Sequence, residues 1–148
     1  MSLYSFCELL DPPSKNQLDF LYKLLSNREV TISHTKMPSF KEHVHFVLNN
    51  PYEFWFILKY NNKNVGSLYI NSDNSVGIHL LKEFNHLSSK YLNSFEQKFK
   101  PLNEIKSKRS KYFSFNISPK DKYMKKLLES NDYQIVQLSY QKKITPNS

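Results

Sequence analysis

The stretch YEFWFILKYNNKNVGSLYINSDNSVGIHLL, Tyr52 to Leu81, decides the fold. Its first segment, YEFWFILKY, is apolar at odd and even positions alike, which is typical of a central strand covered on both faces. The polar turns NNKN and SDNS separate it from VGSLYI and VGIHLL, two further strand-like runs. The stretch therefore predicts a three-stranded antiparallel meander.

Upstream of the meander the sequence predicts one strand and two helices. The strand covers Tyr4–Leu10, and Ser14 is placed to cap the helix that follows. The capping box Ser39-Phe-Lys-Glu42 opens the second helix, because the serine and the glutamate satisfy each other's free backbone donors. At helical spacing the second helix is expected to bury Phe40, Val44, Val47 and Leu48.

Downstream of the meander the pattern changes to helix, strand, helix and strand. Apolar residues recur every four positions along one side of the first helix, at Leu87, Tyr91, Phe95 and Phe99. KYFSFNI then reads as a strand, Ser118-Pro119 as the start of a helix and YQIVQLSYQKK as a last strand. The whole order predicts an α/β protein with a mixed sheet and helices on both faces, in one domain over 1–148 with a loose tail at 143–148.

Composition and charge narrow the class of protein. At 148 residues with one cysteine, Cys7, the chain suits a single domain without disulfides, as in a reducing cytoplasm. No apolar run reaches the ~20 residues that span a bilayer, and the N-terminus does not resemble a signal peptide, so we expect a soluble cytoplasmic protein without membrane contact. The net charge of +8 falls entirely on residues 82–148, which favours an anionic partner there, unless the lysines simply form a solvated surface.

Four stretches between Asn27 and Lys142 carry a family resemblance. They are ISHTKMPSFKEHVHFV, PYEFWFILKYNNKNVGSLYI, SVGIHLLKEF and NISPKDKYMKKLLESNDYQIVQLSY. In them the chain resembles the GNAT superfamily of N-acetyltransferases, and in particular bacterial members that acetylate amino groups of surface sugars. The resemblance implies a splayed, mostly antiparallel sheet, with acetyl-CoA between the fourth and fifth strands and direct transfer of acetyl to a bound amine.

The resemblance also implies which residues meet acetyl-CoA. VGIHLL corresponds to the fourth strand, whose free backbone groups at Ile78, Leu80 and Leu81 would pair with the pantetheine arm, with Asn116 opposite them. The pyrophosphate loop corresponds to EFNHLSSKYL, which has no glycine and places His86, Leu87, Ser88 and Ser89 where the family has its glycine-rich turn. Since a Cβ there hinders the approach of the backbone to a phosphate, we expect a degenerate loop and weak or lost acetyl-CoA binding.

Candidate catalytic and acceptor residues follow from the same alignment. His79 lies on the fourth strand with a parity opposite to Val76, Ile78 and Leu80, so it is the first candidate to accept a proton from the amine or to position it. Its alternative is a half-buried histidine bonded to backbone. Glu53 is the second candidate, with a solvated strand edge as its alternative. Three residues on the loop and second helix are expected to contact the acceptor: His34, Met37 and His43. The alternative for His43 is a place at the border of the core, beside Phe40 and Val47.

Other kinds of site find less support in the sequence. His43 and His45 are two apart on a helix and diverge, and there is one cysteine, so no metal site is predicted. No Gly-x-Ser-x-Gly motif indicates a serine nucleophile. The aromatic residues fall on strand and helix stripes, which disfavours nucleic acid as a partner and leaves KSKRSKYF as the only basic and aromatic segment of interest.

Two functions therefore stay open. The first is an N-acetyltransferase acting on a small-molecule amine such as a nucleotide-linked amino sugar. The alternative is a catalytically degenerate GNAT-fold module for binding or assembly that has lost CoA. A homodimer is compatible with either.

Overall fold

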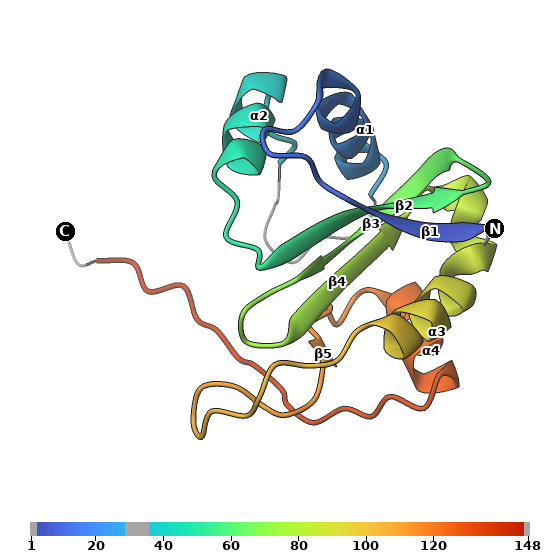
Figure 1. Cartoon of the computed structure of the whole chain (residues 1–148). Coiled ribbons are helices and arrows are strands. Elements are labelled where there is room, and N and C mark those ends of the chain that lie inside the picture. The colour runs from blue at the N-terminus through green and yellow to red at the C-terminus, as the bar shows by residue number, and fades with distance from the viewer. Residues whose placement is uncertain (1–2, 29–35, 147–148) are drawn as a thin grey trace.

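The computed structural model describes residues 3–28 and 36–146. In this part of the chain a strand and two helices precede a three-stranded meander, and helices with one short strand follow it (Figure 1). In order they are β1 (Tyr4–Glu8), α1 (Lys15–Ser26), α2 (Phe40–Leu48), β2 (Phe54–Tyr60), β3 (Lys63–Ile70), β4 (Ser75–Leu80), the 3₁₀ helix η1 (Lys82–Leu87), α3 (Ser88–Lys98), β5 (Ser114–Phe115) and α4 (Lys122–Ser130).

The strands form one mixed sheet in the order β1-β2-β3-β4-β5. The first four strands are antiparallel to their neighbours, and β5 runs parallel to β4. Helices α1 and α2 lie on one face of the sheet, and α3 and α4 on the other (Figure 1). The predicted α/β fold with a mostly antiparallel sheet is confirmed.

Short turns fix the register of the meander. Asn61 and Asn62 join β2 to β3 with φ of 49° and 67°, as a primed hairpin turn requires, and asparagine tolerates this left-handed region better than most residues. The β3–β4 turn ends at Asn74, which has a φ of 69°. As predicted, β2 is covered on both faces, since Trp55, Phe56, Ile57 and Leu58 are all buried.

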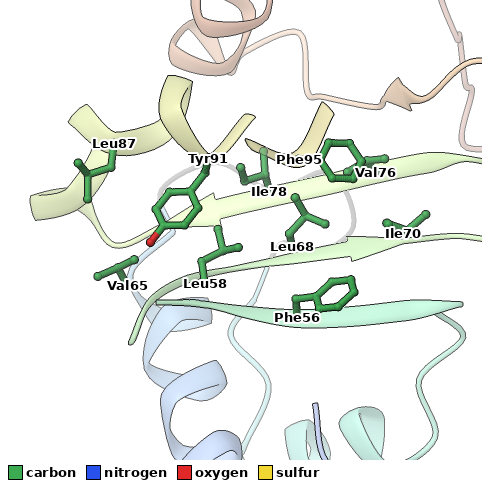
Figure 2. Close-up of a cluster of buried hydrophobic side chains, with 10 residues drawn as sticks. All are labelled: Phe56, Leu58, Val65, Leu68, Ile70, Val76, Ile78, Leu87, Tyr91 and Phe95. Atoms are coloured by element: carbon green, nitrogen blue, oxygen red, sulfur yellow. The ribbon is translucent and has the colours of Figure 1, made fainter. Parts of the chain in front are cut away.

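The core on the α3 face is built from alternate residues of the sheet (Figure 2). In Figure 2, Tyr91 and Phe95 of α3 lie over Leu58, Leu68 and Ile78 of the three central strands. Both aromatic rings are completely buried, and the Tyr91 hydroxyl donates a hydrogen bond to the carbonyl of Lys59. Phe99 packs against this core from just beyond the helix, as the C-cap residue in extended conformation.

A second core lies between the sheet and the helix pair α1–α2. Both helices begin with complete capping boxes, Ser14 with Gln17 and Ser39 with Glu42, as the sequence predicts for Ser39. The core contains residues from both helices and the opposite face of the sheet: Phe20, Leu21, Leu24, Val47, Trp55, Ile57 and Leu81.

The buried side of α2 differs from the prediction. Phe40 and Leu48 are 43% and 52% exposed, and the buried residues are His43 and Val47. The helix therefore buries only a narrow strip, since residues four apart lie on one line of its surface.

The C-terminal third departs most from the sequence prediction. Strand β5 is two residues long, and α4 begins at Lys122 after the cap Asp121, later than Ser118-Pro119. The predicted last strand is wrong, because residues 133–146 have no regular secondary structure in the described part of the chain. From Ile135 onward the apolar side chains of this segment are exposed, with Val136 at 87% and Tyr140 at 90%. An alternating pattern becomes a strand only where a neighbouring strand accepts its hydrogen bonds, and β5 offers a very short edge.

Asn74 anchors the chain that leads into β5. Its side chain is fully buried and donates to the carbonyl oxygens of Leu102 (2.9 Å) and Ser110 (2.8 Å), while its Oδ1 accepts from the Leu102 amide. Its own carbonyl accepts from the Ser114 amide at the start of β5. One buried asparagine thus fixes where β5 meets β4. Within the described ranges no helix has the length and apolar character needed to cross a membrane.

Candidate functional site

Strands β4 and β5 are paired at one end only. Ser75 pairs with Ser114 and Val76 with Phe115, and no further pair follows. A cavity of about 720 Å³ lies where the strands separate, under α1 and α2. Its walls include the inner part of β4, the residues that follow β5, and side chains from the helix pair: Gly77, Ile78, His79, Asn116, Ile117, Ser118, Leu24, Arg28, His43 and Phe46.

The backbone of β4 presents free groups to this opening. Asn71 donates to Ser75 and Leu81 donates to Val65, so the odd-numbered residues of β4 hydrogen-bond with β3. By the alternation of an antiparallel pair, the N–H and C=O groups of Ile78 and Leu80 point to the β5 side. Pairing with β5 ends at Val76, so these groups have no strand partner in the described part of the chain. Leu81 differs, because its N–H bonds Val65 and its C=O accepts from Phe84.

His79 faces the cavity from the α1–α2 side of the sheet. Ile78 and Leu80 pack into the α3-face core, and His79 has the opposite parity, as the sequence predicts. Its Nε2 is buried and has no hydrogen-bond partner. Burial, helped by the nearby guanidinium of Arg28, lowers the pKa of His79 from 6.5 to about 3. The imidazole is therefore neutral at pH 7.

Three aromatic rings form the wall beside His79. Tyr52 and Tyr69 stack with ring centroids 4.0 Å apart and planes within 2°, and Trp55 meets Tyr52 edge-on at 4.9 Å. Burial raises the pKa of Tyr52 well above its usual value. The indole Nε1 of Trp55 is buried without a hydrogen-bond partner.

The helix pair supplies the opposite wall. His43 is 5% exposed, its Nε2 is buried without a partner, and burial lowers the pKa of its imidazole despite a hydrogen bond to the Leu18 backbone. Met37 also lines the cavity. His34 lies outside the described residues. Of the predicted acceptor residues, His43 and Met37 are thus at the cavity with His79.

Glu53, the second catalytic candidate, is elsewhere. It is exposed, it precedes β2, and it is not among the residues that line the cavity. Its backbone amide bonds the carbonyl of Ile70, so its position is a solvated strand edge.

The turn between β4 and α3 is helical and has no open cradle of backbone amides. The 3₁₀ helix η1 occupies Lys82–Leu87 and leads directly into α3, where the amide of Ser88 bonds the carbonyl of Asn85. The hydroxyl of Tyr123, from α4, hydrogen-bonds both that carbonyl (2.7 Å) and the hydroxyl of Ser88 (2.9 Å).

The side chains of the predicted pyrophosphate loop do not converge on one site. Leu87 is buried in the α3-face core, His86 is exposed, and Ser89 accepts a hydrogen bond from Asn131. Among the described residues there is no group of three or more His, Cys, Asp or Glu side chains placed to hold a metal ion.

The cavity residues that sequence reasoning missed include Arg28, Tyr52, Trp55 and Tyr69. The strand register could have found Trp55 and Tyr69. Ser67 pairs with His79 across β3 and β4, and Tyr69, two residues after Ser67, pairs with Trp55 across β2 and β3. Trp55, Tyr69 and His79 therefore lie on the same face of the sheet. Arg28 follows the end of α1, and no periodic signal points to it.

Comparison with known proteins finds similarity in structure but not in sequence. No protein-family model matches the chain, and no curated protein matches it in sequence. A solved structure of "a possible acetyltransferase from Clostridium difficile 630" matches with a TM-score of 0.58 and 13% identity, over 98% of this chain and 100% of that one. An aminoglycoside acetyltransferase from an uncultured soil metagenomic sample, in complex with sisomicin, matches with a TM-score of 0.49 and 13% identity, over 95% and 97%. The first of these similarities shows that the chain shares the fold of this possible acetyltransferase.

Proposed function

We propose that this chain is a GNAT-type N-acetyltransferase that moves acetyl from acetyl-CoA to the amine of a small molecule, with nucleotide-linked amino sugars as the first acceptor class to test. The observation that carries the proposal is the separation of the parallel strands β4 and β5 over a cavity that His79 faces. The fold shared with the possible acetyltransferase from Clostridium difficile supports it.

The residues fit one end of acetyl-CoA better than the other. Ile78 and Leu80 offer unpaired backbone groups on the β5 side, which suit the amide groups of a pantetheine arm. At the start of α3 the fit is poor, since the Ser88 amide is already bonded and Tyr123 covers the turn. We therefore expect binding through the pantetheine arm and a low affinity. When bound, acetyl-CoA supplies a thioester whose carbonyl carbon is open to attack by an amine.

His79 is suited to hold the amine at that point. An alkyl ammonium has a pKa near 10, as lysine does, so an imidazole with a pKa of about 3 is a weak base toward it. In the tautomer that carries its proton on Nδ1, the free Nε2 of His79 can accept a hydrogen bond from an amine that has already lost its proton to water. This hydrogen bond would orient the nitrogen lone pair, a contribution from positioning.

A second candidate function is a binding or assembly module that uses no CoA. The helical turn at η1 and the Tyr123 hydrogen bonds favour it, because they fill the place where a pyrophosphate would need free amides. Incubating the full chain with acetyl-CoA and a panel of amines, and following acetylated product by mass spectrometry, separates the two. The enzyme predicts a product that His79→Leu reduces, and the module predicts no product with any amine.

A further inference from the structure

Arg28 places a cation in the cavity wall. It lies two residues after the end of α1, and its side chain lines the same cavity as His79, Tyr52 and Tyr69. The residue is half-buried, and burial lowers the pKa of its guanidinium. A guanidinium nonetheless stays protonated at neutral pH, so a full positive charge sits in a partly dry site.

In the described part of the chain no carboxylate lies within ion-pair distance of this charge, and the negative charge of Asp121, which also borders the cavity, stabilises it only from further away. The ion pair found there is between Lys15 and Asp19 on the surface of α1, and no side-chain hydrogen bond involves Arg28. Two carboxylates border the cavity, but both cap helices: Glu42 accepts from the Ser39 amide and Asp121 from the Met124 amide. A half-buried cation without a direct ion-pair partner is costly, and a ligand that supplies a negative charge in contact with it lowers that cost.

Buried polar atoms in the same cavity also lack partners. Nε2 of His79, Nε2 of His43 and Nε1 of Trp55 are all buried and unpaired. Such atoms are rare in native proteins and call for an explanation, and a polar ligand would satisfy them. Arg28 and these ring nitrogens together describe a site for a ligand that is both anionic and hydrogen-bonding.

We infer that the acceptor carries an anionic group, a carboxylate or a phosphate, which pairs with Arg28 while its amine reaches Nε2 of His79. The inference rests on the proposed function, because it names the acceptor class for the same cavity. The planar fork of the guanidinium matches two oxygens of either anion. Acceptors with one cationic amine and no anion would leave Arg28 without a direct ion-pair partner.

Trp55 provides a direct readout of binding. It is the only tryptophan of the chain and lines the cavity, so its fluorescence reports ligand entry without acetyl-CoA. The probes are glucosamine, glucosamine 6-phosphate and glucosaminuronic acid, which share a scaffold and an amine but are neutral, phosphorylated or carboxylated at C6. At constant ionic strength we expect at least one anionic sugar to half-saturate the signal at about 10-fold lower concentration than glucosamine, the scale of a hydrogen bond to a charged group.

Variants assign this preference to Arg28. Arg28→Gln should abolish the preference, and Arg28→Lys should keep part of it, because a point charge remains without the fork. Lys41→Gln is the matched control, since it removes one positive charge from an exposed position of α2 outside the cavity wall. It should retain the full preference.

Two results would overturn the inference. One is wild-type protein that shows no preference for the anionic sugars, including no binding of any of the three. This comparison holds even if Arg28→Gln does not fold. The other is a folded Arg28→Gln protein, judged by thermal unfolding, that keeps the preference. A larger effect for the phosphate or for the carboxylate identifies which anion the natural acceptor carries.

Failure of the proposed function gives a different pattern. Anion preference through Arg28 without any acetylated product would retain the anion site and reject acetyl transfer. Acetylation of neutral amines at a rate that Arg28→Gln does not change would retain the enzyme and reject the anion site.

Discussion

Gly77 of β4 lies directly opposite Tyr69 of β3, and a Cβ at position 77 would overlap the Tyr69 ring. The absence of a side chain at Gly77 is what lets the Tyr69 ring lie across β4 and stack on Tyr52. The aromatic wall of the cavity therefore depends on a glycine in the strand interior, a position where glycine often marks a close approach.

Gly77→Ala should destabilise the protein by about 1–3 kcal/mol, as overpacked sites usually do. The reason is that Tyr69 must leave its stack with Tyr52 to make room. Urea unfolding measures the change. In a Tyr69→Ser background the same Gly77→Ala substitution should cost much less, and equal costs in the two backgrounds would contradict the contact as the cause.

His79→Leu should separate function from stability. Leucine removes a buried nitrogen that has no partner, so at pH 7.5 the free energy of unfolding should stay the same or rise. Acetyl transfer should fall by about 10- to 100-fold, the scale of one lost hydrogen bond to the reacting group. His45→Leu, at an exposed position of α2, is the control and should change neither quantity. A destabilised His79→Leu protein with wild-type specific activity would make His79 a core residue.

The pH dependence of stability should carry the signature of His79. Its pKa is about 3 in the folded protein and 6.5 in the unfolded chain, so between these values the unfolded state binds the extra proton. Wild-type stability should therefore fall as the pH drops below 6.5, by at most about 1.4 kcal/mol per pH unit from this group. His79→Leu should fall less steeply between pH 7.5 and 5. His43, whose pKa is also lowered, is present in both proteins and cancels in the comparison. Parallel curves for the two proteins would mean that His79 is not held neutral.

The exposed C-terminal run predicts tolerance to substitution. Leu138 is 71% exposed, whereas Leu127 of α4 is 8% exposed. Leu138→Ala should change the free energy of unfolding by less than about 0.5 kcal/mol, and Leu127→Ala should cost about 2 kcal/mol or more. Equal costs would show that residues 133–146 pack as the strand that their alternating pattern suggests.

Much of the fold could be predicted from local signals. The hairpin turn at Asn61–Asn62, the capping box at Ser39 and the four-residue spacing of Tyr91 and Phe95 each act within a few residues. The predictions for the length of β5 and for the last strand were wrong because contacts with residues distant in sequence decide both structures. The position of β5 depends on the hydrogen bond that the Ser114 amide donates to the carbonyl of Asn74, forty residues earlier. The last segment depends on a strand edge that β5 barely provides.

Two signals located part of the candidate site: strand parity for His79, and the family resemblance for Met37 and His43. Parity placed His79 in the cavity and would also have placed Trp55 and Tyr69, given the register. It could not place Arg28, which reaches the cavity from the end of a helix. Parity also could not predict the 3₁₀ helix before α3 or its contact with Tyr123. The Tyr123 hydroxyl hydrogen-bonds the carbonyl of Asn85, which is 38 positions away in the sequence.

Calorimetric titration of the full chain with acetyl-CoA and with S-acetylpantetheine, which lacks the pyrophosphate, tests acetyl-CoA recognition between β4 and β5 most directly. We predict that both ligands bind with dissociation constants between about 10 μM and 1 mM, and that the two constants differ by less than about 10-fold. The reason is that the pantetheine arm meets free backbone groups at Ile78 and Leu80, whereas the N-terminus of α3 has no open set of amides for the pyrophosphate. No heat from either ligand at millimolar concentration would contradict the acetyltransferase and favour the CoA-free module.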